Sequence, residues 1–205
     1  MSLLTESLEQ ILIQLEQKDP EIASSLQPGL TREEIDQIAN DLPFKLPEEV
    51  YELYQWQNGI SGSIGFGYGA WNGISAGFSS LEVTIQYLYN SKKRNCPSNF
   101  LFIFSFVHHL GGDYFGISLD DKTHPVFNFY EDDERYIKNI NHSFIRRRTI
   151  SSDLTTLMYA TAECLKNAMY SETNSNGYTS LEFDEDKVKH IFNKYRQGNF
   201  KIYKI

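Results

Sequence analysis

Residues 46–59 constrain the fold of this chain more than any other part of its sequence. Pro47 suits the first turn of a helix, because the backbone N–H that proline lacks has no intrahelical partner there. Glu48 and Glu49 follow, at the helix end whose dipole favours carboxylates. Helical spacing places four residues on one face: Val50, Leu53, Tyr54 and Gln57. Asn58-Gly59 is typical of a helix end that needs a left-handed residue. The segment therefore predicts a short acidic helix that stops at Gly59.

Five more amphipathic helices are predicted from apolar spacing and from the capping residues at their starts. One spans residues 3–17, and one begins at Thr31, which can form a capping box with Glu34. A third begins at Ser79 or Ser80, a fourth at residues 151–153, and the last spans residues 184–197. Their expected inward residues include Leu4, Leu8, Ile11, Leu12, Leu15, Ile35, Leu81, Ile85, Leu88, Tyr89, Leu154, Leu157, Met158, Thr161, Leu165, Val188, Ile191, Phe192 and Tyr195.

Strands are expected in the middle of the chain. Residues 59–77 hold seven of the 13 glycines, interleaved with aromatic residues, which predicts a tight loop and an irregular strand near residues 70–74. Residues 100–107, 114–119 and 125–130 are rich in aromatic and β-branched residues, and turn residues separate them. A meander is the simplest connection of such strands. We therefore expect a single α+β domain over residues 1–205, with a central antiparallel sheet flanked by N- and C-terminal helices.

The charge balance bears on the class of partner. The chain has 27 acidic and 19 basic residues and a net charge of −8, which disfavours a broad nucleic-acid surface. This balance suits a basic protein partner, although it also serves solubility alone. The two cysteines, Cys96 and Cys164, are too few for a disulfide framework or a thiolate zinc site. No signal peptide and no membrane span are recognisable, so a cytoplasmic location is expected.

Three motifs follow one another in the order typical of a known family. The first is the Leu-Pro helix that ends at Asn58-Gly59, and the second is the glycine-rich strand and helix of residues 65–89. The third is a pair of strands around Gly111-Gly112-Asp113, within residues 102–119. In this order and spacing the chain resembles the SUKH superfamily of the Smi/Knr type over about residues 30–170. Helices 3–17 and 184–197 then look like additions to the family core.

The resemblance implies a binding protein that has no enzymatic activity and no cofactor. Family members are cell-wall synthesis regulators of fungi and bacterial immunity proteins against secreted toxins. The expected function is neutralisation of a toxin domain, and the alternative is a regulatory scaffold of the cell-wall-regulator type. Many family members carry a proline just before the strand that leads to Gly-Gly-Asp, whereas residues 100–104 are an unbroken apolar run here, and the His108-His109 pair is a second departure. Partner identity, binding face and oligomeric state stay open.

Candidate partner-binding residues are aromatic or acidic. The aromatic candidates are Phe66, Tyr68 and Trp71 in the glycine-rich segment, where ordinary core packing is the alternative. The acidic candidates are Asp113 and a run that can steer a basic partner, although the run also fits a solvated loop: Glu131, Asp132, Asp133 and Glu134. Residues 146–148 form an arginine run, which fits a solvated loop, an anion site or a partner for the acidic run.

Three patterns raise the possibility of other chemistry. Residues 73–77 match G-x-S-x-G with Ser75 as the nucleophile of a small serine hydrolase, but only helices are expected before it. The glycines of residues 65–69 lack the spacing of a phosphate-binding loop. His108 and His109 point to opposite faces of a strand, so together with Asp113 they are a poor metal site. No metal is expected.

Overall fold

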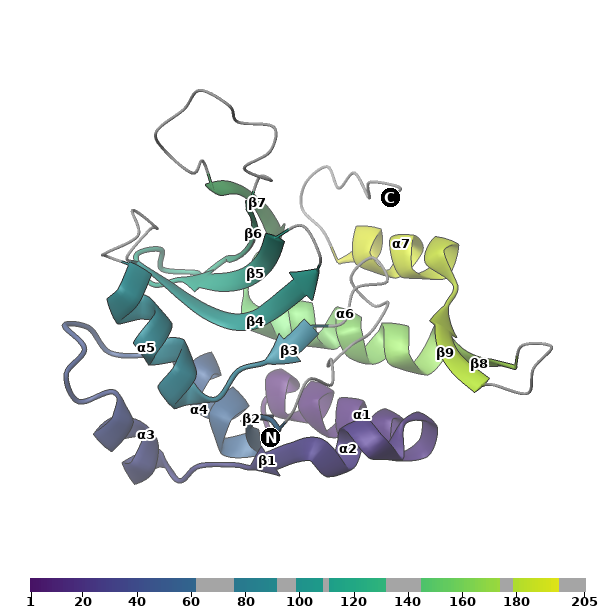
Figure 1. The fold of residues 1–205 in the computed structure, drawn as a ribbon, viewed down its shortest axis with the longest axis horizontal. Helices are drawn as coiled ribbons and strands as arrows, with labels where there is room; N and C mark the ends of the chain where they lie inside the picture. Colours follow the sequence, from purple (N-terminus) through teal and green to yellow (C-terminus); the bar gives the residue numbers. More distant parts are fainter. Residues whose placement is uncertain (62–75, 92–98, 109–110, 132–144, 174–178, 196–205) are drawn as a thin grey trace.

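A computed structural model describes residues 1–61, 76–91, 99–108, 111–131, 145–173 and 179–195. Side chains at residues 76, 90–91, 105–108, 111–113, 130–131, 145–147, 171–173 and 179–181 are outside this description. The helices are α1 (Leu3–Lys18), α2 (Pro20–Ser25), α3 (Arg32–Ile38), α4 (Glu48–Trp56), α5 (Leu81–Ser91), α6 (Leu154–Asn167) and α7 (Glu185–Lys194). The strands are β1 (Leu26–Pro28), β2 (Gln57–Ile60), β3 (Ala76–Phe78), β4 (Phe100–His108), β5 (Gly111–Ser118), β6 (Val126–Glu131), β7 (Ile145–Ser151), β8 (Met169–Thr173) and β9 (Thr179–Phe183). Figure 1 shows their arrangement.

The five-stranded sheet at the centre has the order β3-β4-β5-β6-β7, and every neighbouring pair is antiparallel. Sequence order and spatial order are the same, so the sheet is a meander. Two smaller sheets, β1-β2 and β8-β9, lie outside it. This arrangement confirms the predicted α+β class with a central antiparallel sheet.

The central sheet is apolar on both faces, because apolar side chains occupy consecutive positions along its inner strands. One face belongs to the main core and includes Leu101, Ile103, Phe104, Phe115, Ile117 and Val126. The other face carries an aromatic cluster of Phe100, Phe102 and Phe129, against which Tyr114 and Phe127 pack. Gly116 lies beneath this cluster, where a Cβ would come within 3.1 Å of the Phe102 and Phe129 rings. The rings can therefore approach the backbone closely only because residue 116 is glycine.

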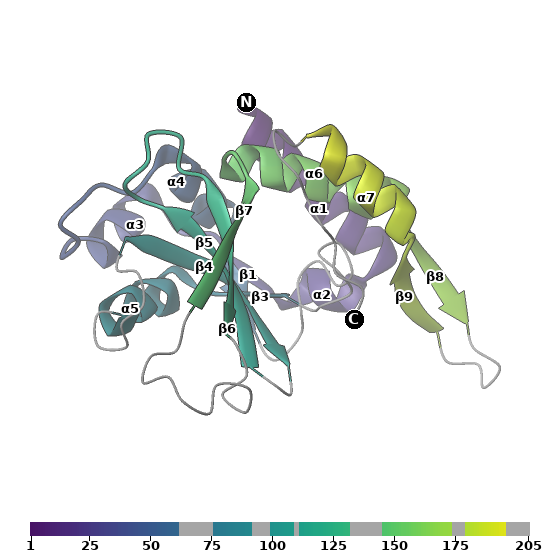
Figure 2. The ribbon, with the colours of Figure 1, turned by 90° about the horizontal axis from the view of Figure 1, so that it is seen from above.

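Helices α1, α4 and α6 supply much of the main core. α1 buries Leu4, Leu8, Ile11 and Leu15, as its spacing predicts, and packs against α6. Figures 1 and 2 both show these two helices side by side. Lys18, at the end of α1, donates hydrogen bonds to the backbone carbonyls of Leu165, Lys166 and Met169. The lysine thus caps the C-terminal end of α6, where carbonyls lack intrahelical partners.

Asn58 and Gly59 have a different role from the predicted one. α4 ends at Trp56, and Gln57 is its extended C-cap, so Asn58-Gly59 belongs to strand β2. The Asn58 side chain accepts a hydrogen bond from the backbone N–H of Leu81 (2.9 Å) at the start of α5. Gly59 has φ +88° and lies so close to α5 that a Cβ would be 2.6 Å from the Ser80 nitrogen. The prediction of a helix-ending pair was therefore wrong: these residues hold the N-terminus of α5.

Tyr54 connects α4 to the segment that enters α5. Its side chain is fully buried, and its ring stacks on Phe78 of β3 with the centroids 5.6 Å apart. The hydroxyl donates to the Ser79 carbonyl (3.2 Å) and shares a 3.0 Å hydrogen bond with the Thr84 hydroxyl. Burial raises the pKa of the phenol well above its usual value. The buried site therefore favours the protonated form of the tyrosine.

The capping predictions are largely confirmed. Thr31 and Glu34 form both hydrogen bonds of a capping box. Asp153 accepts from the Thr156 N–H at the start of α6, and Asp184 accepts from the Lys187 N–H at the start of α7. Ser80 accepts from the Val83 N–H at the start of α5. Short polar side chains at helix starts are thus a reliable guide to where these helices begin.

Several elements differ from the prediction. α2, expected to be part of a connector, is a six-residue helix with Asp19 as its N-cap, too short for a visible apolar period. β7 contains the arginine run of residues 146–148, which lacks apolar alternation, and β8-β9 surrounds the polar residues 174–178. Gly111-Gly112-Asp113 lies within β5 instead of forming a turn. Tyr89 is 40% exposed, although it was expected in the core. The strand expected near residues 70–74 lies outside the described residues.

Replacing Gly59 with alanine tests the close approach to α5. We expect Gly59→Ala to lower the free energy of unfolding by about 2–4 kcal/mol, because it combines backbone strain with a steric clash. Asn58→Ala, which removes one helix-capping acceptor, should cost about 1 kcal/mol. Urea denaturation measures both values. If Gly59→Ala were as mild as Asn58→Ala, the close approach would not exist in solution.

Replacing Tyr54 with phenylalanine tests the buried phenol. We expect Tyr54→Phe to lower the free energy of unfolding by about 1–2 kcal/mol near neutral pH, because the Ser79 carbonyl loses a donor. The pKa of Tyr54 is raised in the folded state. The phenol therefore contributes fully to the free energy of unfolding below its unfolded pKa near 10, and this contribution declines as the pH rises above that value. The variant should lack this alkaline decline. Denaturation series from pH 7 to 11 compare the two proteins, and equal slopes above pH 10 would contradict the assignment.

Candidate protein-binding surface

One row of backbone pairings crosses all five strands of the central sheet. Ala76 pairs with Phe106, Phe106 with Asp113, Asp113 with Tyr130, and Tyr130 with Arg146. Each strand of the sheet therefore begins or ends close to this row. We call this line of paired residues the 76–146 row. We call the end of the sheet at which these residues lie the 76–146 end.

The row brings together segments that sequence analysis singled out separately. Residue 75 directly precedes Ala76, so the glycine-rich segment joins the sheet here. Glu131, which begins the acidic run, follows Tyr130 and pairs with Ile145. Asp113 is itself in the row, and Arg146 begins the arginine run. Three predicted candidate regions and the arginine run thus attach to one end of the sheet.

The predicted site residues themselves are only partly covered by the structure. Asp113 and Glu131 are on strands, but their side chains are not described. The remaining candidates lie outside the described residues: Phe66, Tyr68, Trp71, Asp132, Asp133 and Glu134. Their roles in binding stay predictions. The backbone register nevertheless places Asp113 beside Tyr130, one residue from Glu131.

Aromatic side chains extend from this end of the sheet to the surface of α5. Tyr114, next to Asp113, packs edge-on against Phe102 with the ring centroids 5.8 Å apart. On its other side, Tyr114 meets Tyr87 of α5, with the centroids 6.5 Å apart. Tyr87 is 42% exposed. A continuous aromatic path therefore leads from the buried cluster of the sheet to solvent.

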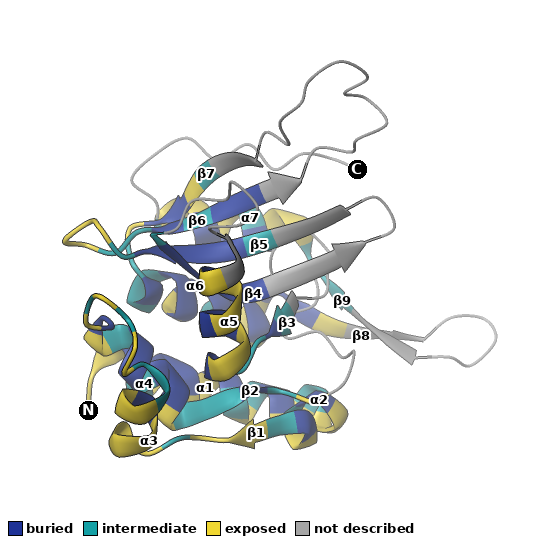
Figure 3. Cartoon of the chain, turned by 60° about the vertical axis from the view of Figure 1, so that its left-hand side comes forward, coloured by how far each residue is buried: buried dark blue, intermediate teal, exposed yellow. Residues whose placement is uncertain are grey.

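The outer side of α5 exposes large apolar and aromatic side chains. Val83 and Tyr87, one turn apart, are 40% and 42% exposed, and Tyr89 is exposed as well. Figure 3 shows the exposed residues along this helix. Sequence analysis missed the pair, because it followed only the apolar stripe that faces the core. The available signal was that Val83 and Tyr87 have helical spacing of their own. We call Val83, Tyr87 and Tyr114 the tyrosine surface.

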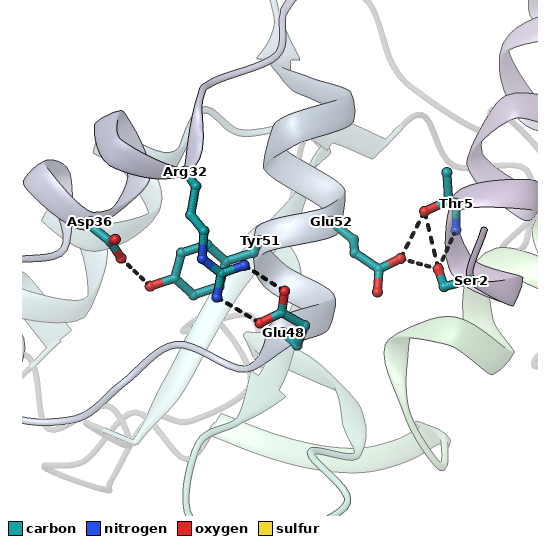
Figure 4. Close-up of polar contacts among 7 residues, drawn as sticks. All are labelled: Ser2, Thr5, Arg32, Asp36, Glu48, Tyr51 and Glu52. Atoms are coloured by element: carbon teal, nitrogen blue, oxygen red, sulfur yellow. Dashed lines mark hydrogen bonds and ion pairs between the residues drawn. The ribbon is translucent and has the colours of Figure 1, made fainter.

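The acidic residues of α4 are engaged in contacts that fix the helix. Arg32 of α3 forms a bidentate ion pair with Glu48, at 2.6 and 2.9 Å, and its guanidinium lies 4.2 Å from the centre of the Tyr51 ring. The Tyr51 hydroxyl donates to Asp36. Figure 4 shows this group. The Arg32 hydrogen bonds lower the pKa of the Glu48 carboxyl, and the Asp36 hydrogen bond raises the pKa of Tyr51.

The two other carboxylates of α4 contact the helices α6 and α1. Glu49 accepts from the backbone N–H of Thr155 (2.9 Å) and from its hydroxyl, at the N-terminus of α6. Glu52 accepts from the hydroxyls of Ser2 and Thr5 at the start of α1, as Figure 4 shows. Sequence analysis assigned Glu48 and Glu49 to the helix dipole alone. Their tertiary partners show that they also hold neighbouring helices in place.

The residues that the sequence suggests for catalysis or metal binding are mostly not described. Ser75, His109 and the glycines of residues 65–69 lie outside the described part, and the side chains of His108 and Asp113 are not described. Cys164 is buried in α6, and burial raises the pKa of its thiol to about 12. Among the described residues, no three histidine, cysteine, aspartate or glutamate side chains gather in a way that could hold a metal ion. In the same residues, no helix combines the length and the apolar character that crossing a bilayer requires.

Comparison with known proteins identifies one family. The model of the SMI1 / KNR4 family (SUKH-1) matches residues 29–146, more than half of the chain. No curated protein matches the chain. The matched segment contains α4, the 76–146 row and the tyrosine surface, whereas α1, α6 and α7 lie outside it.

The ion pair of Arg32 with Glu48 can be tested by titration. We expect Arg32→Gln to raise the pKa of the Glu48 carboxyl toward its ordinary value, whereas Lys45→Gln should leave it unchanged. NMR titration of the glutamate carboxyl carbons measures this shift. The side chains of Arg32 and Glu48 are 48% and 62% exposed, so solvent screening should keep the change in unfolding free energy small. An unchanged Glu48 pKa in Arg32→Gln would contradict the pairing.

Proposed function

Because the chain belongs to the SMI1/KNR4 family (SUKH-1), we propose that it is a non-enzymatic module that binds another protein, and that it acts as an immunity protein against a bacterial toxin domain. The observation that carries the proposal is the convergence of the candidate segments on one end of the sheet, beside the tyrosine surface. The alternative partner is a signalling or cell-wall enzyme of the same cell, as expected of a regulator.

The tyrosine surface has the chemistry of a binding hot spot. Tyrosine contributes a large, rigid contact area with a polar tip, and such residues dominate the binding energy of many interfaces. Tyr87 is half-exposed, and its ring rests on Tyr114, which in turn rests on Phe102. The ring therefore needs little rearrangement to receive a partner, which keeps the entropic cost of binding low.

Acidic residues near α5 suit a basic partner. Residues 31–56, which contain α3 and α4, hold two basic residues, Arg32 and Lys45, and seven acidic ones: Glu33, Glu34, Asp36, Asp41, Glu48, Glu49 and Glu52. This segment alone accounts for −5 of the net charge of −8. α3 packs against α5, so we expect the field of these carboxylates to extend toward the tyrosine surface. Such a field accelerates encounter with a positively charged protein.

The mechanism of neutralisation that we propose is occlusion. A toxin domain docked on the 76–146 end and the tyrosine surface would have its active site covered by a surface that is already formed. No bond would be made or broken on this chain. Ser75 would then be dispensable, and Ser75→Ala should retain full affinity for the partner.

Binding of the partner can be tested with a matched pair of tyrosine substitutions. The partner is first captured from the native host with the full chain and identified by mass spectrometry. We expect Tyr87→Ser to raise the Kd at least tenfold, about 1.4 kcal/mol, because it removes an anchor. Tyr170→Ser changes a tyrosine of similar exposure on β8, 48% against 42%, and should leave the Kd unchanged. Calorimetry measures both values, and the opposite pattern would refute the tyrosine surface as the binding site.

Charge at the 76–146 end is tested separately. We expect Glu131→Lys to slow association and to weaken its dependence on ionic strength, whereas Glu9→Lys on α1 should have little effect. Stopped-flow association rates at several salt concentrations make the comparison. An association rate that does not vary with salt would contradict electrostatic steering.

A captured toxin domain would support immunity, and a captured host enzyme would support the regulator instead.

A further inference from the structure

Strands β8 and β9 form a two-stranded ribbon that projects from the body of the molecule. Consecutive residue pairs join the two strands from Met169 opposite Phe183 to Thr173 opposite Thr179, and the register runs without a bulge. Figures 1 and 2 both place the ribbon at the end of the molecule opposite α5. It lies outside the residues matched by the family model and is separate from the tyrosine surface.

The other outer strands of the described sheets carry features that discourage pairing with a further strand. β7 contains the arginines of residues 146–148 and a register shift, and both charges and irregularities protect an edge. β3 has only three residues, and the short β1-β2 pair contains Pro28 and a register shift. Residues 169–183 contain no proline, lysine or arginine, and their only charges are Glu172 and Glu182. Among the described strands, the ribbon is therefore the least protected edge.

The direction of the backbone groups in the ribbon follows from its hydrogen bonds. The N–H of Asp184 donates to the carbonyl of Ala168 (2.9 Å), one position beyond the last residue pair. In an antiparallel ladder, hydrogen-bonded pairs alternate with pairs whose backbone groups point outward. The pairs that direct their N–H and C=O groups away from the opposite strand are therefore 169/183, 171/181 and 173/179.

β9 offers the more open of the two edges. On β8, the outward carbonyl of Met169 already accepts a hydrogen bond from Lys18, and the strand packs against α6. Among the described elements, β8 is the main neighbour of β9, and no described strand pairs with the outer edge of β9. The outward backbone groups of Thr179, Leu181 and Phe183 are thus placed to pair with a further strand.

We propose that the outer edge of β9 pairs with β9 of a second copy of this chain, which gives a dimer with a continuous four-stranded sheet. A twofold axis at Leu181 aligns the whole of both strands, and the outward groups of residues 179, 181 and 183 then meet their counterparts. In this register Glu182 lies opposite Ser180 of the second copy, so no carboxylate of β9 faces another.

The strand is self-complementary in this register, which favours a second copy as the occupant. The two neighbouring registers with the same hydrogen-bond alternation lose residue pairs at the ends of the strands, and one of them places Glu182 opposite Glu182, which like-charge repulsion disfavours. A two-stranded ribbon alone is marginally stable in water, and pairing with a second ribbon supplies the additional strands that such a sheet needs.

The dimer leaves the tyrosine surface of each copy accessible, because the ribbon and α5 lie at opposite ends of the molecule (Figure 1). Each copy can therefore bind its own partner. The proposal is independent of the proposed function, and its failure in an experiment would leave that function untouched.

Analytical ultracentrifugation of the full chain tests the dimer with a matched pair of proline substitutions. Residues 171 and 181 lie opposite each other in the ribbon, and proline at either position removes an outward N–H without removing a hydrogen bond between β8 and β9. We expect Leu181→Pro to raise the Kd of the dimer at least tenfold, whereas Ser171→Pro should leave it unchanged. A full chain that sediments as a monomer at every concentration up to its solubility limit would overturn the proposal.

Cysteine cross-linking tests the register, and it decides the outcome if both prolines disturb the ribbon. In a chain that carries Cys96→Ser, the substitution Leu181→Cys places two Cα atoms about 5.5 Å apart across the twofold axis, within the span of a disulfide. We expect oxidation to join two copies of this variant, whereas Ser171→Cys on β8 should remain uncrosslinked on non-reducing electrophoresis.

Two results of the cross-linking experiment would contradict the pairing of β9 with β9. Cross-linking of Ser171→Cys to the same extent as Leu181→Cys, or of neither variant, overturns the proposal. If the chain is monomeric and Leu181→Pro instead weakens binding of the captured partner, the proposal is likewise overturned, and the edge of β9 belongs to that partner.

Discussion

The hydrogen bonds between α4 and its neighbours are the constraint on which the rest of the fold depends. Tyr54 carries this helix into the core and ties it to Ser79 and Thr84. Glu49 reaches the N-terminus of α6, more than a hundred residues away in the sequence. Beyond the helix, Asn58 receives the N-terminus of α5. A segment of about a dozen residues thus determines where three other parts of the chain lie. Each of these contacts satisfies a polar group that would otherwise lose hydrogen bonds on burial.

The hydrophobic unit is larger than the segment that the family model matches. Residues 29–146 contain the central sheet except for most of β7, and they contain α3, α4 and α5. α1 and α6 lie outside that segment, yet Leu8, Ile11, Leu154 and Met158 on these helices are at most 1% exposed. The sheet face that carries Ile103 and Ile117 packs into the same core. The flanking helices are therefore part of the folded core, whatever their part in binding.

Sequence reasoning succeeded where a local pattern has one physical meaning. Thr31 with Glu34, Asp153 and Asp184 cap helices in any context, and apolar runs such as residues 100–107 become buried strands. It failed where two meanings share one pattern. Asn58-Gly59 ends many helices. Here the Asn58 amide instead accepts a hydrogen bond from the start of α5, and the absence of a Cβ at Gly59 makes room for that helix. Both contacts depend on tertiary structure. The arginines of β7 carry no strand signal, because pairing with β6 determines their conformation. The tyrosine surface was missed for a related reason: exposure is decided by which side of α5 faces the sheet.

The 76–146 row has a consequence for how such a protein diverges over time. The segments that attach there lie between strands whose pairing does not depend on them, since the register of the sheet continues from Phe106 to Phe100 and from Tyr130 to Val126. Insertions, deletions and exchanges in these connections would leave the hydrogen-bonded ladder intact. One scaffold can thereby exchange the segments at this end of the sheet while the strand pairing that stabilises it stays the same.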